Sequence, residues 1–419
     1  MVATLSFIGK ELAASLALES PRHDFYESGS SLSLSQKIIK DNNLLIRSEN
    51  FEALKYLKKI EAKFNIIYID PPYNTGLKFT FNDKFKAQHE NQDAWLCMMF
   101  PRIILAHNIL NENGVMFVSI DDRENANLTV IMREIFGKEN HIGTIKWRKK
   151  NKPSFLDKHI GNVIEYVLIF AKDKAKLMKL VGNKSTELSR PVLNFTNPIS
   201  SRILYAGTKA KCKDGVYNKG VYTNRTLNLE INNSAIIKNG FLQNDLLVYG
   251  KFRVSQDILN QSVFITKSFG LRRIIKDIEQ VKRHATDDAT LNYESNEDAE
   301  TQLKSLFNGE KVFDFPKPVG LLKNLLSMYQ NKCDNEKINC LDFFAGTATL
   351  AQAVHELNFK NENKYSFCCI QNEEKINKLI NYKGLYSVAD IAQQRITTIE
   401  EKYKIFPRCK IFITKSQKN

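Results

Sequence analysis

The segment Ile66-Ile67-Tyr68-Ile69-Asp70-Pro71-Pro72-Tyr73 decides the fold that we expect. Its apolar half predicts a buried strand, and an acidic residue at the carboxyl end of a strand is where open α/β sheets bind ligands. The two prolines favour extended backbone, so the Asp70 carboxylate and the Pro71 carbonyl can point at one spot beside the Tyr73 ring. Two acceptors beside an aromatic plate suit an exocyclic amino group on a planar base. The alternative is a strand that ends in a proline-rich turn with a half-buried tyrosine.

Strand and helix patterns alternate on both sides of this segment. A short strand and a helix are expected before it, at residues 43–46 and 51–57. After it we expect helices at 95–110 and 124–136, the second capped by Asp121 or Asp122, and strands at 115–120, 142–147 and 163–171. Such alternation predicts an α/β fold with a mostly parallel sheet.

The middle of the chain, residues 172–310, has poor periodicity and scattered Tyr, Asn, Lys and Arg. This composition suits a surface that contacts the phosphates and base edges of nucleic acid, and it suits an irregular polar domain nearly as well. The basic run 148–153 is either a solvated face or a phosphate-contacting edge. We expect the acidic stretch 287–300 to be a loop. A helix is expected to carry Arg272, Arg273, Lys276, Lys282 and Arg283.

A second stretch with chemical character starts at residue 338. An apolar strand, 338–341, runs into Asp342-Phe343-Phe344-Ala345-Gly346-Thr347-Ala348-Thr349 and then into a helix at 350–357. A strand, a turn of small residues and a helix can cradle a nucleotide-like ligand, because small residues let the backbone approach it. A further strand, 365–370, ends near Glu373 and Glu374, which could accept hydrogen bonds from ribose hydroxyls or could simply start the next helix.

Composition narrows the class of protein. The 419 residues include 61 Lys and Arg against 46 Asp and Glu, and the resulting net charge of +15 indicates a polyanionic partner. Seven cysteines without a C-x-x-C pair fit neither a disulfide scaffold nor a zinc site, so a reducing cytoplasm is expected. No apolar run reaches the length of a membrane span, and residues 1–10 lack the order of a signal peptide.

Three motifs together resemble those of a known family. Asp70-Pro71-Pro72-Tyr73 precedes Phe313-x-x-Pro316-Lys317-Pro318, and the Phe344-x-Gly346 turn follows. This order resembles the β-class DNA adenine-N6 methyltransferases. The likeness extends over residues 43–171 and 300–400, where the chain resembles the modification subunit of type III restriction systems. The chain is shorter than that subunit usually is, which leaves the type II or type III assignment open.

The resemblance implies a Rossmann-like, doubly wound methyltransferase sheet and a set of site residues. The implied catalytic residues are Asp70, Pro71, Pro72 and Tyr73. The implied cofactor is S-adenosylmethionine, without a metal, held by Lys317, Pro318, Asp342, Phe343, Phe344, Ala345, Gly346, Thr347, Thr349 and Glu374. Double-stranded DNA is the implied substrate, and a second copy of the chain and a restriction subunit are the implied partners. Cytosine-N4 methylation and a lapsed enzyme that only binds DNA are the alternatives.

The motifs also predict a division of the chain. Residues 1–42 form an accessory arm, 43–171 the catalytic half, 172–310 an inserted target recognition domain, and 311–419 the cofactor-binding half.

Ala348 departs from the family turn, which usually reads Gly-x-Gly. We expect Ala348 to be the start of the following helix, where alanine is favoured. In the alternative it is left-handed at a cost of about 1 to 2 kcal/mol, which would weaken cofactor affinity by roughly ten- to thirtyfold relative to glycine.

Overall fold

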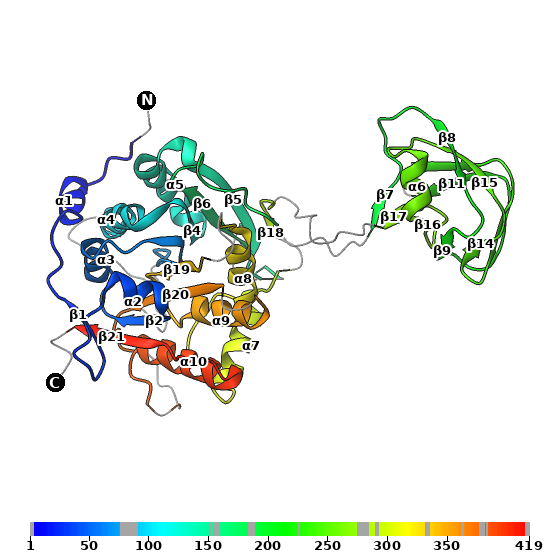
Figure 1. Cartoon of the computed structure of the whole chain (residues 1–419). Helices are drawn as coiled ribbons and strands as arrows, with labels where there is room; N and C mark the ends of the chain where they lie inside the picture. The colour runs from blue at the N-terminus through cyan, green and yellow to red at the C-terminus, as the bar shows by residue number, and fades with distance from the viewer. Residues whose placement is uncertain are drawn as a thin grey trace. The chain divides into compact units, whose positions relative to one another are not determined.

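The computed structural model describes residues 4–75, 91–150, 152–153, 159–182, 189–224, 227–274, 285–289, 293–331, 336–361, 364–376, 382 and 384–414. The chain divides into two units (Figure 1). The first unit comprises Met1–Gly182 and His284–Asn419, and the inserted unit comprises Asn183–Arg283. Each unit is described by itself below.

A ten-stranded sheet forms the centre of the first unit. Its strand order is β1-β21-β2-β20-β19-β3-β4-β6-β5-β18. The strands are β1 (Phe25–Glu27), β21 (Lys410–Thr414), β2 (Leu44–Arg47), β20 (Tyr365–Gln371), β19 (Ile338–Asp342), β3 (Phe64–Ile69), β4 (Leu110–Ile120), β6 (Ile164–Ala171), β5 (His141–Arg148) and β18 (Asp288–Ala289). Neighbours from β21 to β4 are parallel, whereas β1 and β6 run against their neighbours. The prediction of a mostly parallel sheet is confirmed.

The direction of winding reverses between β19 and β3. From β3 the chain passes through helix α4 (Asn91–Ile109) to β4 on one side, and from β19 it passes through α9 (Thr349–Asn361) to β20 on the other side. The two strands are adjacent and parallel, with Leu341 opposite Ile67. In open α/β sheets the crevice at such a switch point is the usual ligand site. The doubly wound prediction is therefore confirmed.

Helices cover both faces of this sheet (Figure 1). Alternate residues of β3 enter two separate hydrophobic clusters, Ile67 and Ile69 in one and Ile66 and Tyr68 in the other. The first cluster includes residues of α1 (Lys10–Leu16), α3 (Asn50–Lys59), α4 and α5 (Asp122–Phe136). The second includes residues of α8 (Val319–Met328), α9 and α10 (Val388–Tyr403). Burial on both faces explains why these strands are almost continuously apolar.

The ends of the first unit's helices follow from local chemistry. Asp121 accepts a hydrogen bond from the Arg123 N–H and caps α5 as predicted, and Gly137 ends that helix. Residues 4–42, the predicted arm, contribute α1, α2 (Gln36–Asp41) and β1 to this unit, and β1 pairs with β21. A short 3₁₀ helix, η1 (Lys138–Asn140), precedes β5.

The inserted unit is built mainly from short strands. Seven form one sheet in the order β10-β13-β14-β9-β16-β17-β7, and four form another in the order β11-β12-β15-β8. Their bounds, with one helix, are β7 (Ser189–Pro191), β8 (Ser200–Leu204), β9 (Lys209–Ala210), β10 (Gly215–Tyr217), β11 (Gly220–Asn224), β12 (Leu227–Ile231), β13 (Ala235–Lys238), β14 (Phe241–Leu242), β15 (Leu246–Gly250), α6 (Gln256–Ser262), β16 (Val263–Ile265) and β17 (Leu271–Ile274). This unit has a hydrophobic core of its own.

Two predictions for the middle of the chain are wrong. Arg272 and Arg273 lie on strand β17, not on a helix, while Lys276, Lys282 and Arg283 lie outside the described residues. The acidic stretch 287–300 contains β18 and the start of α7 (Asn296–Leu306). Ser295 and Asp298 form a reciprocal capping box there. Glu297 and Asp298 therefore lie in the first turn of a helix, where negative charge is favourable, while residues 293–295 before it have no regular secondary structure.

Candidate active site

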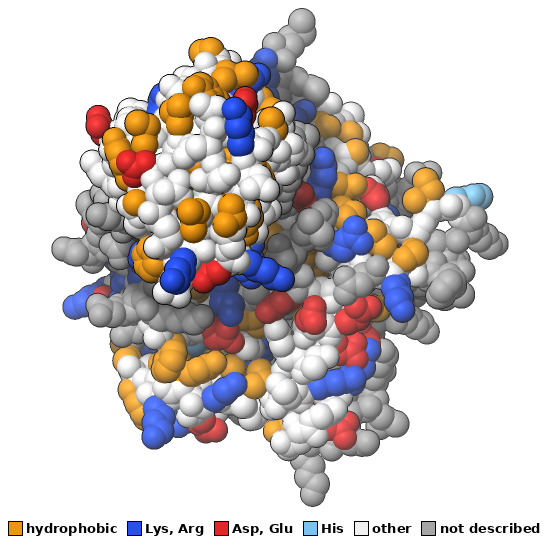
Figure 2. Space-filling view, turned by 90° about the vertical axis from the view of Figure 1, so that its right-hand side faces the viewer, with side chains coloured by type: hydrophobic (Ala, Val, Ile, Leu, Met, Phe, Trp, Pro, Cys, Tyr) orange, Lys and Arg blue, Asp and Glu red, His pale blue; other side chains and the backbone are white. Residues whose placement is uncertain are grey.

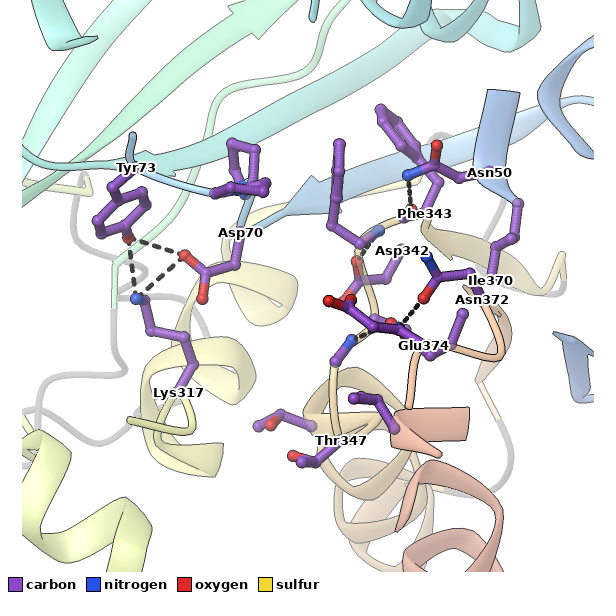
Figure 3. Close-up of a pocket in the computed structure, with 18 of the residues that line it drawn as sticks. Asn50, Asp70, Tyr73, Lys317, Asp342, Phe343, Thr347, Ile370, Asn372 and Glu374 are labelled. Atoms are coloured by element: carbon purple, nitrogen blue, oxygen red, sulfur yellow. Dashed lines mark hydrogen bonds and ion pairs between the residues drawn. The ribbon is translucent and has the colours of Figure 1, made fainter. Parts of the chain in front are cut away.

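A cavity of about 1420 Å³ opens at the switch point between β3 and β19. Asp70 follows β3 and Asp342 ends β19, so the two motifs that are far apart in sequence line one cavity. Figure 3 shows Asp70, Tyr73 and Lys317 on one side of it and Asp342, Thr347 and Glu374 on the other. All ten predicted cofactor residues except Pro318 line the cavity, as do the four predicted catalytic residues.

The catalytic loop is fixed by contacts with its own and neighbouring elements. The Tyr73 hydroxyl donates to Asp70 Oδ1 at 2.7 Å. The indole N–H of Trp95, a fully buried residue of α4, donates to the Pro72 carbonyl at 2.6 Å. The side chain of Asn74, whose φ is +58°, donates to Glu124 at 2.9 Å. The loop is thus held in place on both sides of the two prolines.

The Lys317 side chain lies against Asp70. Its Nζ is 3.0 Å from Asp70 Oδ1, 3.1 Å from Glu165 Oε2 and 2.9 Å from the Tyr73 hydroxyl (Figure 3). Lys149 pairs with the other oxygen of Glu165, Oε1, at 3.2 Å. Sequence reasoning placed Lys317 beside the cofactor and not beside Asp70, and it missed Glu165. The available signal was one acidic residue within the otherwise apolar strand 163–171.

Burial and charge shift the pKa values of this group in different directions. Burial raises the pKa of Asp70 above its ordinary value, although the Lys317 ammonium opposes the rise. Burial works against an ionised Glu165 too, but Lys317 and Lys149 together lower its pKa. Burial alone would lower the pKa of Lys317, and the two carboxylates raise it instead. Lys317 is therefore held as a cation.

The second motif forms a tight turn between β19 and α9. Its Phe344 N–H donates to Asp342 Oδ1 at 3.0 Å, and its Gly346 N–H donates to the Gln371 side chain at 2.8 Å. Gly346 has a φ of +53°, and Asn50 anchors the Phe343 carbonyl at 2.7 Å. The sequence did not predict a site role for Asn50. The available signal was its place in the polar segment Ser48-Glu49-Asn50, shortly after the predicted strand 43–46.

Ala348 lies in this turn with a φ of +57°, so its preferred assignment to the helix is wrong. The helix begins one residue later, at Thr349. The Ala348 N–H donates to the Ala345 carbonyl at 2.7 Å, which closes a turn of four residues. Gly346 in the same turn is left-handed as well, and this backbone conformation is uncommon for residues other than glycine.

A buried arginine donates hydrogen bonds to the side chains of this turn. Arg395 of α10 is 1% exposed and donates to the Thr347 and Thr349 hydroxyls at 2.8 and 2.9 Å, and to Gln352 at 2.9 Å. Sequence reasoning missed it. The signal was a basic residue at helical spacing from Ile391 and Ile399, on the apolar face of the last helix.

The two glutamates after β20 have different partners. Glu373 pairs with Arg47 at 2.6 Å and accepts a hydrogen bond from Ser387 at 3.0 Å. Glu374 lines the cavity near the turn (Figure 3).

In the described part of the chain, no group of three or more His, Cys, Asp and Glu could hold a metal ion. Nor does any helix among the described residues combine the length and apolar character needed to cross a membrane.

Residues 64–382 match the model of a family described as DNA methylase, the N6 and N4 methyltransferases. The chain belongs to the N6/N4 DNA methylase family. The chain is 27% identical over 394 residues to the StyLTI Mod subunit, a type III restriction-modification enzyme of Salmonella typhimurium. It is 29% identical over 470 residues to the EcoPI Mod subunit of Escherichia phage P1. It is 25% identical over 408 residues to the type II methyltransferase M.KpnI of Klebsiella pneumoniae.

The relatives differ in how much of their length is matched. The alignments use 87%, 95% and 87% of this chain, in the same order. They span 58% and 68% of the two Mod subunits but 89% of the type II enzyme. The expected family is therefore confirmed, while the type II or type III assignment stays a prediction.

Proposed function

We propose that this chain is a site-specific DNA methyltransferase that transfers the methyl group of S-adenosylmethionine to the N6 amino group of adenine. The observation that carries the proposal is the placement of Asp70 and the Asp342–Thr349 turn in one cavity, at the switch point of the sheet. An acceptor for an amino group and a cradle for a nucleoside then lie next to each other.

In this proposal the Asp70 carboxylate and the Pro71 carbonyl accept the two N6 hydrogens. Holding both hydrogens directs the nitrogen lone pair out of ring conjugation and toward the methyl donor, so alignment is the main catalytic contribution. The target adenine must leave the duplex, which costs a few kcal/mol. Stacking on the Tyr73 ring at about 1 to 3 kcal/mol can offset much of that cost.

The part of the cavity lined by the Asp342–Thr349 turn is complementary in charge to S-adenosylmethionine. Asp342 is 2% exposed, and burial raises its pKa well above the ordinary value. Among the described residues no basic side chain pairs with it. A buried acid of this kind is stabilised by a cationic ligand, and the cofactor carries an ammonium and a sulfonium. Gly346 and the small turn residues would let the cofactor approach the backbone, and Glu374 would accept from the ribose. The bound cofactor supplies an already activated methyl group.

The inserted unit supports DNA as the substrate. Asn183–Arg283 contains 17 Lys and Arg against 7 Asp and Glu, which is +10 of the chain's net charge of +15. A basic surface is the electrostatic footprint of nucleic-acid binding. We therefore propose that this unit is the target recognition domain. A restriction subunit, a second copy of the chain and a cytoplasmic location also belong to the proposal.

Replacing Asp70 with alanine tests the proposal. We expect Asp70→Ala to lose methylation of double-stranded DNA while it keeps its fold and binds S-adenosylmethionine as before, because the carboxylate faces the cavity. The measurements are methyl transfer from labelled cofactor, nucleoside analysis of the product, and calorimetric titration. Asp173→Ala removes a surface carboxylate that pairs with Lys176 and is the matched control.

Three results would count against the proposal. A folded Asp70→Ala protein that methylates at a near-native rate refutes the acceptor role. N4-methylcytosine in the product identifies the alternative base. A wild-type chain that binds DNA but transfers no methyl group is the lapsed enzyme.

A further inference from the structure

We infer that Lys317 is a positioning residue that orients Asp70 for methyl transfer and that Glu165 holds Lys317 in place. This inference rests on the proposed function, because it concerns how the same site presents its acceptor. It assigns the Lys317 side chain to the amino group's side of the cavity and gives Glu165 a role in the reaction.

The Lys317 ammonium has a fixed position because every one of its donors has an acceptor. An ammonium carries three N–H donors. Its three acceptors, on Asp70, Glu165 and Tyr73, lie 2.9 to 3.1 Å from Nζ. The Nζ also lies 4.9 Å from the centre of the Tyr73 ring. Both Lys317 and Glu165 are buried, so water cannot easily replace these contacts.

The same contacts leave one oxygen of Asp70 for the substrate. Oδ1 receives two hydrogen bonds, one from the Tyr73 hydroxyl at 2.7 Å and one from Lys317 at 3.0 Å. Oδ2 receives none from any described residue, and in Figure 3 both dashed lines at Asp70 reach the same oxygen. A carboxylate held through one oxygen can present the other in a defined direction. Lys317 and Tyr73 thus aim Oδ2 at the incoming amino group.

Charge gives Lys317 a second effect on Asp70. The buried group contains two carboxylates, Asp70 and Glu165, and two ammoniums, Lys317 and Lys149, so it is neutral when all four are ionised. Without Lys317, Asp70 would lie buried beside Glu165 and would bind a proton more readily. A protonated Asp70 carries a donor where the amino group needs an acceptor.

Other titratable groups face this cluster from the neighbouring strands and helices. They are Tyr68 on β3, Tyr73 in the catalytic loop, Asp121 at the start of α5 and Asp342 on β19. Lys317 is the cation in direct contact with Asp70 among the described residues.

The test compares the pH dependence of kcat in variants of the full chain. In Lys317→Met we expect kcat at neutral pH to fall by about tenfold or more and its acid limb to move up by about one pH unit or more, since Asp70 loses its cation. The dissociation constant of S-adenosylmethionine should stay within about threefold, less than the 1.4 kcal/mol of a tenfold change. Lys323→Met is the matched control, because Lys323 lies on α8 and pairs with Glu356 at 2.6 Å outside the cavity.

Glu165→Gln provides a variant of nearly equal shape with the opposite electrostatic effect. It removes a negative charge beside Asp70, so the acid limb should move to lower pH while kcat falls because Lys317 loses a partner. Loss of packing alone would not move the acid limb of Lys317→Met to higher pH and that of Glu165→Gln to lower pH.

The outcomes separate this inference from the proposed function. If the wild type transfers no methyl group to adenine in DNA, the proposed function fails, and the inference fails with it. If the wild type is active and Lys317→Met is folded with an unchanged pH profile, only the inference is overturned. If Lys317→Met does not fold, the acid limb of Glu165→Gln decides: a move to lower pH supports the inference, and no move or a move to higher pH overturns it.

Discussion

At the scale of single residues, Ala348 separates what local sequence predicts from what the fold imposes. Helix propensity favoured a helical alanine, yet the residue is fully buried with a φ of +57°. Its conformation is fixed by the protein's own contacts, the bond to the Ala345 carbonyl and the Arg395 bonds to Thr347 and Thr349. The left-handed cost is therefore part of the folding free energy and need not reduce cofactor affinity.

We accordingly expect Ala348→Gly to bind S-adenosylmethionine within about threefold of wild type, less than the 1.4 kcal/mol of a tenfold change. The free energy of unfolding should change by only about 1 kcal/mol, because relief of left-handed strain offsets the lost buried methyl and the extra freedom of unfolded glycine. Calorimetric titration and denaturant unfolding measure the two quantities. A tenfold gain in affinity would show that the turn rearranges when the cofactor binds.

The candidate site was predictable only where its residues are contiguous. The Asp70–Tyr73 and Asp342–Thr349 segments each combine a strand and a turn, so their sequence carries their geometry. Lys317 reaches Tyr73 across 244 residues, and no local pattern encodes that contact. Glu165 and Arg395 were visible only as charged residues in apolar patterns, for which exposure was the simpler interpretation.

At the scale of elements, predictability follows strand length and burial. The strands of the first unit's core are four or more residues long and buried on both faces, so their apolar runs stand out. The described strands of the inserted unit all have two to five residues. In β13, Ala235 and Ile237 are buried while Ile236 and Lys238 are exposed, an alternation too short to distinguish from a polar loop.

His107 tests how α4 packs against the elements beside it. Its ring packs edge-on against Phe136 of α5, and Lys172 Nζ lies 3.2 Å from its Nδ1. Burial, with a further contribution from Lys172, lowers the pKa of His107 to about 4. The unfolded chain therefore binds a proton below about pH 6.5 that the folded protein binds only near pH 4.

We expect the free energy of unfolding to decrease as the pH falls from about 6.5 toward 4, and to decrease less in His107→Gln. The stabilisation from neutral His107 is fully present above the pKa of histidine in the unfolded chain, about 6.5, and it is lost as the pH falls toward the folded pKa of about 4. Denaturant unfolding at several pH values measures the difference between the variant and the wild type. The exposed His159→Gln is the control. Identical slopes for His107→Gln and wild type would show that His107 is not held neutral.

At the scale of the whole molecule, the order of functions along the chain follows from one insertion. The two halves of the first unit's sheet flank Asn183–Arg283, so the unit that carries most of the positive charge interrupts the unit that carries the cavity. The space-filling view shows hydrophobic and basic side chains interspersed on the face that it displays (Figure 2). On the seven-stranded sheet of the inserted unit, exposed Phe241 lies between Lys209 and Lys238 on the adjacent strands.

The last prediction concerns this charged unit and the salt dependence of DNA binding. If Lys209 and Lys238 contact phosphates, replacing both with glutamine should make the slope of log affinity against log salt less negative by about 2, close to one per lost contact. Methyl transfer at saturating DNA should be unchanged, since Asp70 and its partners lie in the other unit. Lys176→Gln, which breaks an exposed pair with Glu112, is the control for a general loss of charge. An unchanged slope would place the DNA contacts elsewhere on the unit, and a wild-type affinity independent of salt would contradict the assignment of DNA as the substrate.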